Sequence, residues 1–266
     1  MYVEAGQRDL AIRSLQNAVT LNRFYWSNEN ELGLAYFQFG DYANALTAFR
    51  RVVDLDPTNP IGHQNIGAVY FQQGKYQESI PEFERAIALQ TSKPGVFSDL
   101  GLAYLFLGRY DEGVRKLETA AEMSPNDETI IGNLADGYRW SKQPKKAKET
   151  YDRAISLANK ELEVNPRDAS TLGSLAMYHA KTGHAALADY SIRQAQLIDA
   201  SDPQLVYTEA VVRVLANKPE AAIESLRMAM DKGISPEQAS LDPEFNSLHG
   251  NRDFEKLLQE AREKLK

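Results

Sequence analysis

The sequence predicts an all-α fold, a solenoid of antiparallel helix pairs that ends in a C-terminal capping helix. Three observations predict it. Apolar residues recur at helical spacing, glycines and prolines fall where short helices must end, and the whole pattern repeats every 34 residues. Two short amphipathic helices joined by a tight turn cannot bury their apolar faces alone, so each pair needs neighbouring pairs against which to pack.

The clearest copy of the pattern is residues 94–127. Its first helix carries Leu100 and Tyr104 on one face, because they lie four residues apart. Gly108 ends that helix, since glycine adopts the left-handed conformation without a Cβ clash. Pro125 ends the second helix, because proline has no N–H to donate to the preceding turn. The segment therefore predicts one helix, a tight turn and a second helix.

The same residue types recur at the same positions one and two steps of 34 residues upstream. The order L-G-x2-Y, then A-x3-F, then P resembles the tetratricopeptide repeat family, and this resemblance implies a right-handed superhelical solenoid. The tryptophan usual at the fourth position of that repeat is replaced in the three copies. The residues that carry the resemblance are Leu32, Gly33, Tyr36, Gly40, Ala45, Phe49 and Pro57, then Ile66, Gly67, Tyr70, Gly74, Phe83 and Ala86, and the replacements are Glu29, His63 and Phe97.

The chain is expected to form one continuous array. Gly6 matches the template one further step back, so the chain starts inside a helix, with Tyr2 to Ala5 as its last turn, and is expected to be a fragment of a longer protein. In the fourth full repeat the closing proline comes late, at Pro166, by close to two helical turns, so its second helix lengthens. The expected segments are a partial repeat at 1–25, repeats at 26–59, 60–93, 94–127 and 128–168, degenerate repeats at 169–202 and 203–235, and a cap at 236–266.

The two ends of the array carry further expectations. The apolar face of the first complete helix has no predicted neighbour on one side, so we expect this end to favour self-association. The tail contains the turn DPEFNSL and then a helix with one apolar and one charged face, which suits a terminal cap. The two apolar faces are Leu10, Ile12, Leu15 and Val19 near the N-terminus, and Phe254, Leu257, Leu258, Ala261 and Leu265 in the tail.

Composition limits the function classes. The net charge is −7 with 25% charged residues, so the chain has no general attraction for nucleic acid or an anionic membrane. No apolar run is as long as a membrane span and no signal peptide opens the chain, so we expect a cytoplasmic protein. There are no cysteines, the four histidines do not pair at metal-site spacing, and no phosphate loop or catalytic motif is present. We expect no metal, no cofactor and no enzymatic activity.

The family resemblance implies a concave groove lined by the first helices of successive repeats. Large apolar side chains and amides at those positions suit an extended peptide or a partner helix. The alternative for the aromatic residues is that they pack against the next repeat, and a small-molecule pocket is a third interpretation. The predicted groove residues are Asn30, Leu34, Phe37, Gln64, Asn65, Phe71, Ser98, Leu102, Phe106, Asp136, Arg139 and Trp140.

Two further patterns bear on the partner. The clamp that some family members use for a C-terminal carboxylate needs lysine or arginine at template positions two, five, six and nine, and these repeats have none there. The basic cluster from Lys142 to Lys148 lies on a turn and is interpreted as a solvated edge.

The function predicted first is a protein-interaction scaffold. The alternative is a regulatory C-terminal region of a larger bacterial signalling protein (a kinase, cyclase or transcription regulator) acting in cis, because the tail resembles the endings of arrays in such proteins.

Overall fold

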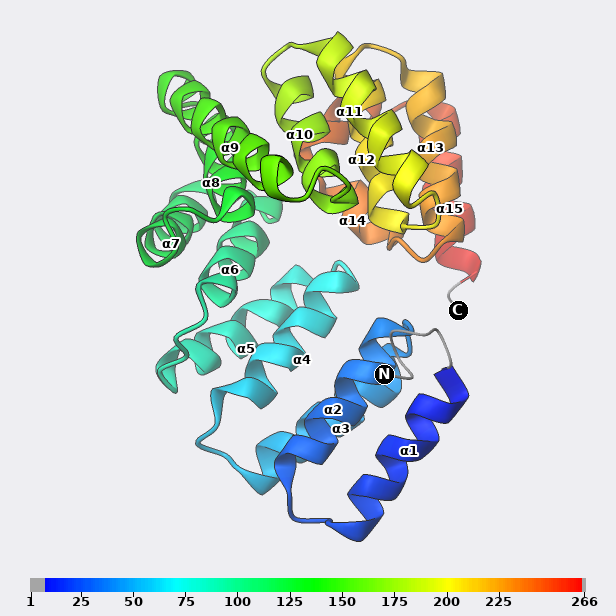
Figure 1. Cartoon of the computed structure of the whole chain (residues 1–266). Coiled ribbons are helices and arrows are strands. Elements are labelled where there is room, and N and C mark those ends of the chain that lie inside the picture. The colour runs from blue at the N-terminus through cyan, green and yellow to red at the C-terminus, as the bar shows by residue number, and fades with distance from the viewer. Residues whose placement is uncertain (1–7, 265–266) are drawn as a thin grey trace. The chain divides into compact units, whose positions relative to one another are not determined.

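The computed structural model describes residues 8–264, and every regular element among them is a helix (Figure 1). The predicted all-α fold of adjacent helix pairs is therefore confirmed. The expectations for Tyr2 to Gly6 and for Leu265 lie outside the described residues. The chain forms two compact units, Met1–Ala103 and Tyr104–Lys266, with the division inside one helix.

Unit 1 consists of consecutive helices that pack in pairs. Helix α2 pairs with α3, α4 pairs with α5, and α1 packs on α2. The first helix of a pair is called A-type below and the second B-type. The helices of unit 1 are α1 (Arg8–Leu21), α2 (Trp26–Gln38), α3 (Tyr42–Leu55), α4 (Pro60–Gln72), α5 (Tyr76–Ala88) and the first part of α6 (Pro94–Phe106).

The helix ends of unit 1 follow from local sequence. Gly40 has φ of 73° after α2, a conformation that side chains with a Cβ rarely adopt. The next residue, Asp41, caps α3 by accepting a hydrogen bond from the backbone N–H of Asn44 at 3.3 Å. Asn59 caps α4 in the same way, accepting from the N–H of Ile61 at 3.0 Å. These caps hold successive helices close to antiparallel with short connections.

A close contact between a glycine of an A-type helix and a phenylalanine of its B-type partner recurs after 34 residues. A Cβ on Gly33 would lie 2.5 Å from Cε1 of Phe49, and a Cβ on Gly67 would lie 2.7 Å from Cδ1 of Phe83. Phe49 and Phe83 are fully buried. Each glycine therefore lets the phenylalanine of the B-type helix lie directly on the backbone of its A-type partner.

Unit 2 continues with the same kind of helix pairs and ends in short elements. Its fourth-repeat helix α9 has 21 residues, against 13 or 14 for the paired helices around it. The helices are the end of α6, α7 (Tyr110–Met123), α8 (Glu128–Trp140), α9 (Pro144–Val164), α10 (Ala169–Lys181), α11 (Ala185–Ile198), α12 (Pro203–Leu215), α13 (Pro219–Asp231), α14 (Pro236–Leu241), the 3₁₀ helix η1 (Pro243–Leu248) and α15 (Arg252–Lys264).

The last helix covers the end of unit 2. Phe254, Leu257 and Leu258 of α15 are buried in a core cluster that also contains Leu226 of α13. The opposite side of α15 carries exposed charges, among them Arg262, which pairs with Glu237 of α14 at 2.8 Å. One buried and one charged face is what the end of a helical array requires.

Candidate functional site

Two A-type helices of unit 1 bring six of the predicted groove residues together. Asn65 on α4 donates through Nδ2 to Oδ1 of Asn30 on α2, at 2.7 Å. Asn30 is buried, whereas Leu34, one turn further along α2, is 39% exposed. We call these residues and their neighbours at the same template positions the unit-1 face. Its members are Asn30, Leu34, Phe37, Gln64, Asn65, Phe71, Ser98 and Leu102.

The aromatic members of this face each pack on a tyrosine of their own helix pair. The ring of Phe37 lies 5.8 Å from that of Tyr42, and the ring of Phe71 lies 5.1 Å from that of Tyr76. Both phenylalanines stay half-buried. Packing between the helices of a pair therefore holds the rings in place without covering them completely.

Polar groups continue along the unit-1 face. The Oε1 atom of Gln64 is buried and has no hydrogen-bond partner among the described residues. On α6, Ser98 is buried and Leu102 is half-buried. Burial raises the pKa of the neighbouring Asp99 to about 7. No charged residue belongs to the face itself, and its polar groups are amides and a hydroxyl.

The four predicted residues of unit 2 lie in a different environment. Asp136 of α8 is buried and accepts hydrogen bonds from the Tyr151 hydroxyl and from Nζ of Lys181. The Nη1 atom of Arg139 lies 2.5 Å from Oε1 of Glu244 in η1. Both α8 residues are therefore engaged by side chains of the same unit.

Lys181 lies between Asp136 and Glu244, and we call Asp136, Arg139, Lys181, Asp242 and Glu244 the ion network. Its Nζ atom lies 2.6 Å from Oδ2 of Asp136 and 3.7 Å from Oε1 of Glu244. Burial by itself would lower the pKa of Lys181, but the two carboxylates outweigh it and raise that pKa above its usual value. The lysine is therefore charged over the whole physiological pH range.

The sequence did not indicate the C-terminal half of the network, Asp242 and Glu244. Asp242 accepts a hydrogen bond from the Tyr207 hydroxyl at 2.6 Å and caps η1 through the N–H of Glu244 at 2.9 Å. Burial, and then the Glu244 carboxylate, raise the pKa of Asp242 to about 6. The DPEFNSL turn was visible as a motif, but its partners on α8, α10 and α12 are distant in sequence.

Phe106 and Trp140 form a separate aromatic pair in unit 2. Their ring centroids lie 5.8 Å apart, and both residues are half-buried. The Trp140 Nε1–H is buried without a hydrogen-bond partner among the described residues. Trp140 also lines a shallow pocket of about 400 Å³ with Arg109 and Lys142. The structure therefore places these two residues together, and Nζ of Lys181 lies over the Trp140 ring, 5.9 Å from its centroid.

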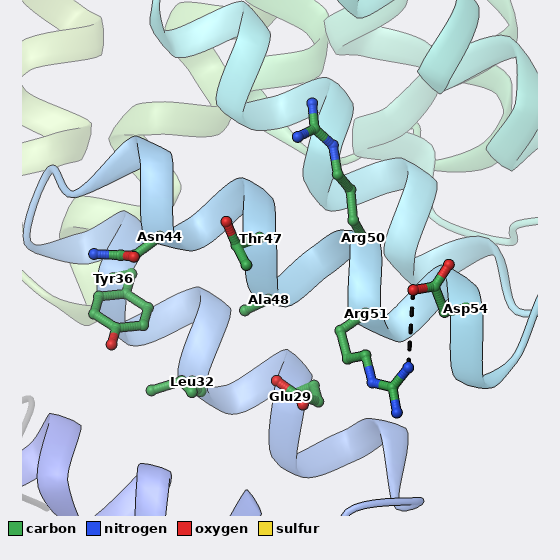
Figure 2. Close-up of a pocket in the computed structure, with 9 residues that line it drawn as sticks. All are labelled: Glu29, Leu32, Tyr36, Asn44, Thr47, Ala48, Arg50, Arg51 and Asp54. Atoms are coloured by element: carbon green, nitrogen blue, oxygen red, sulfur yellow. Dashed lines mark ion pairs between the residues drawn. The ribbon is translucent and has the colours of Figure 1, made fainter.

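A larger pocket lies between α2 and α3 of unit 1, with a volume of about 540 Å³. Figure 2 shows Glu29, Leu32 and Tyr36 along α2, and Arg51 of α3 reaching toward them beside Asp54. Glu29 stands at the fourth template position, where the family resemblance expects tryptophan. Burial raises the pKa of Glu29, and Arg51 opposes that shift. Because an indole is larger than a carboxylate, we expect tryptophan at this position to fill more of the pocket.

The apolar face of α1 is partly covered. Leu10 is 51% exposed, whereas Ile12, Leu15 and Val19 are half-buried. Leu21 at the end of α1 and Phe24 in the connection to α2 are exposed. Self-association through this end stays a prediction.

Residues 8–264 contain neither a membrane-spanning helix nor a cluster of metal ligands. Over residues 8–264, no helix combines the length and the apolar composition that crossing a bilayer requires. Within the same range, no three metal-ligating side chains converge. The His179 and His184 rings lie 6.0 Å apart, with Thr182 Oγ1 at 2.9 Å from Nδ1 of His184.

Helix pairs that repeat with one glycine–phenylalanine contact define a helical-repeat protein. Residues 33–74 and 67–108 match the profile of the TPR repeat, and residues 96–127 match that of the tetratricopeptide repeat. Residues 33–127 are therefore tetratricopeptide repeats. No protein of curated function matches it in sequence.

Solved structures extend the likeness in fold beyond the matched repeats. A chain in the crystal structure of the APC/C hetero-tetramer Cut9-Hcn1 matches over 98% of this chain, with a TM-score of 0.64 and 16% identity, and this chain spans 47% of that one. MamA from Desulfovibrio magneticus RS-1 matches over 60% of this chain and 90% of its own, with a TM-score of 0.54 and 22% identity. MamA AMB-1 matches over 60% of this chain and 94% of its own, with a TM-score of 0.52 and 23% identity. At these identities the likeness is one of fold.

Proposed function

We propose that this protein is an interaction scaffold whose unit-1 face binds an uncharged segment of a partner, as an extended peptide or a helix. One observation carries the proposal. An amide pair joins two neighbouring A-type helices, the half-exposed rings of Phe37 and Phe71 lie near the C-terminal ends of these helices, and no residue of the face is charged. Aromatic anchors beside groups that hydrogen-bond a backbone are a common arrangement for peptide recognition.

The chemistry of the face indicates how a partner is held. Apolar side chains of the partner would pack on Leu34, Phe37 and Phe71, and its backbone N–H groups would donate to amide oxygens of the face. Because the face itself offers no cation, a terminal carboxylate would gain no charge-assisted hydrogen bond of roughly 1.5–3 kcal/mol. Binding should therefore depend little on salt.

Selection from a random peptide library displayed on phage tests the proposal. Selected peptides are titrated against the wild type, Phe71→Ala, Leu34→Ala and the control Tyr190→Ala, which removes an exposed ring in unit 2. We expect each of the first two variants to bind at least ten-fold more weakly, with the control unchanged. Peptides that bind all four proteins equally well would refute the unit-1 face as the binding surface.

A second candidate function is action in cis within a longer signalling protein. The resemblance of the C-terminal tail to array endings in bacterial kinases, cyclases and winged-helix regulators supports it. The coding sequence upstream of Met1 tests it, because such a domain in the same reading frame would support regulation in cis. A stop codon directly upstream would overturn it.

A further inference from the structure

The A-type helices of unit 2 carry the same template positions that form the open face in unit 1. In unit 1, positions nine and twelve hold the partly exposed Leu34 and Phe37. In unit 2, residues at template positions five, nine, twelve and thirteen of α8, α10 and α12 meet the C-terminal tail, directly or, for Asp136, through Lys181. The positions in question, which we call the unit-2 face, are Asp136, Arg139, Met177, Lys181, Tyr207, Val211, Val214 and Leu215.

The polar part of the tail is held by three of these helices. The Glu244 side chain is 3% exposed. Its Oε1 atom lies 2.5 Å from Nη1 of Arg139 in α8 and 3.7 Å from Nζ of Lys181 in α10. Asp242 accepts a hydrogen bond from Tyr207 of α12 at 2.6 Å. One short turn therefore bridges three successive A-type helices, and the contact with Arg139 spans 105 residues of sequence.

The apolar part of the turn fills the space between these anchors. Phe245 is fully buried and meets the ring of Tyr207 edge-on, with centroids 5.5 Å apart. Leu248 is buried in the same cluster as Val211, and Met177 packs against that cluster from α10. The turn thus presents a carboxylate, an aromatic anchor and a second apolar side chain, as a bound peptide would.

We infer that the turn Asp242–Leu248 is a built-in ligand of unit 2, which occupies the unit-2 face in cis and closes it to an external partner. This goes beyond the proposed function, because occupancy does not depend on any partner. It also limits where a partner can bind, since the corresponding face is left open in unit 1. The charges agree with such an occupant, because Arg139 and Lys181 select an acidic segment over an uncharged one.

Amide hydrogen exchange on the full chain tests the inference. Glu244→Ala removes the anchor, and Glu237→Ala is the matched control, because Glu237 is a tail carboxylate that is 40% exposed and pairs with Arg262 of α15. We expect exchange in the last turns of α8 and α10 to accelerate at least ten-fold in Glu244→Ala. Exchange in α11 and in α2 to α5 should stay within two-fold of the wild type in both variants.

Two results would overturn the inference. One is unchanged exchange in α8 and α10, which would mean that the turn does not shield them. The other is equal acceleration in α11, a B-type helix, because a general loss of stability would then explain the effect. If Glu244→Ala loses its helical circular dichroism, the isosteric Glu244→Gln is measured against the same two criteria, since it removes the charge and retains the shape.

Discussion

Lys181→Met is the sharpest test of the ion network in unit 2. The lysine side chain is 4% exposed, and its Nζ atom lies 2.7 and 2.6 Å from the two oxygens of Asp136. Methionine keeps the apolar stem but leaves Asp136 and Glu244 with Arg139 as their remaining cation. Removing one partner of a buried ion pair costs about 3–5 kcal/mol, because the other charge stays buried without compensation. For a unit of this size, that loss lowers the melting temperature by roughly 6–20 °C.

Calorimetry and urea unfolding at neutral pH measure this effect. The control is Lys148→Met, which removes an exposed pair with Asp152 at 2.8 Å on the same face of one helix. Its melting temperature should match the wild type, because solvent screens an exposed pair. A loss of less than about 1 kcal/mol in Lys181→Met would refute the reasoning, since the network would then not depend on its lysine.

Three other predictions concern separate features. Burial raises the pKa of Asp242 from 3.8 to about 6, so its contribution to stability is complete below pH 4 and is lost as the pH rises through 6. Because about one pH unit of that window lies above pH 5, the loss of unfolding free energy between pH 5 and pH 8 should be about 1 kcal/mol larger in the wild type than in Asp242→Asn. Gly132→Ala should destabilise by about 1–3 kcal/mol in urea unfolding, because the new Cβ would overlap the Tyr178 hydroxyl, whereas Gly95→Ala, with open space around it, should not. Glu29→Trp should raise the melting temperature by filling the pocket between α2 and α3, and a lower value would contradict that explanation.

Much of the fold could be predicted from residue spacing. Gly33 and Phe49 recur as Gly67 and Phe83, and this pairing is a local contact between two consecutive helices. Such contacts depend on helical periodicity and turn chemistry, which a sequence displays directly. The helix pairs and their turns were therefore accessible without coordinates.

The candidate site was accessible only in part. Periodicity places Phe37, Phe71 and Arg139 at position twelve of A-type helices and Asp136 at position nine, and nothing in that spacing shows which of these side chains stay exposed. The structure separates them, because the aromatic rings stay half-exposed whereas Asp136 is buried and Arg139 pairs with Glu244.

The sequence by itself determined the repeat, the helix ends and the residue types on each face, because these follow from interactions within one or two helix pairs. The tertiary structure alone decided that the DPEFNSL turn returns across α8, α10 and α12. Pairing Glu244 with Arg139 brings together residues 105 positions apart. Attraction between opposite charges has no sequence period, so only the packing of the tail could show which carboxylate meets which cation.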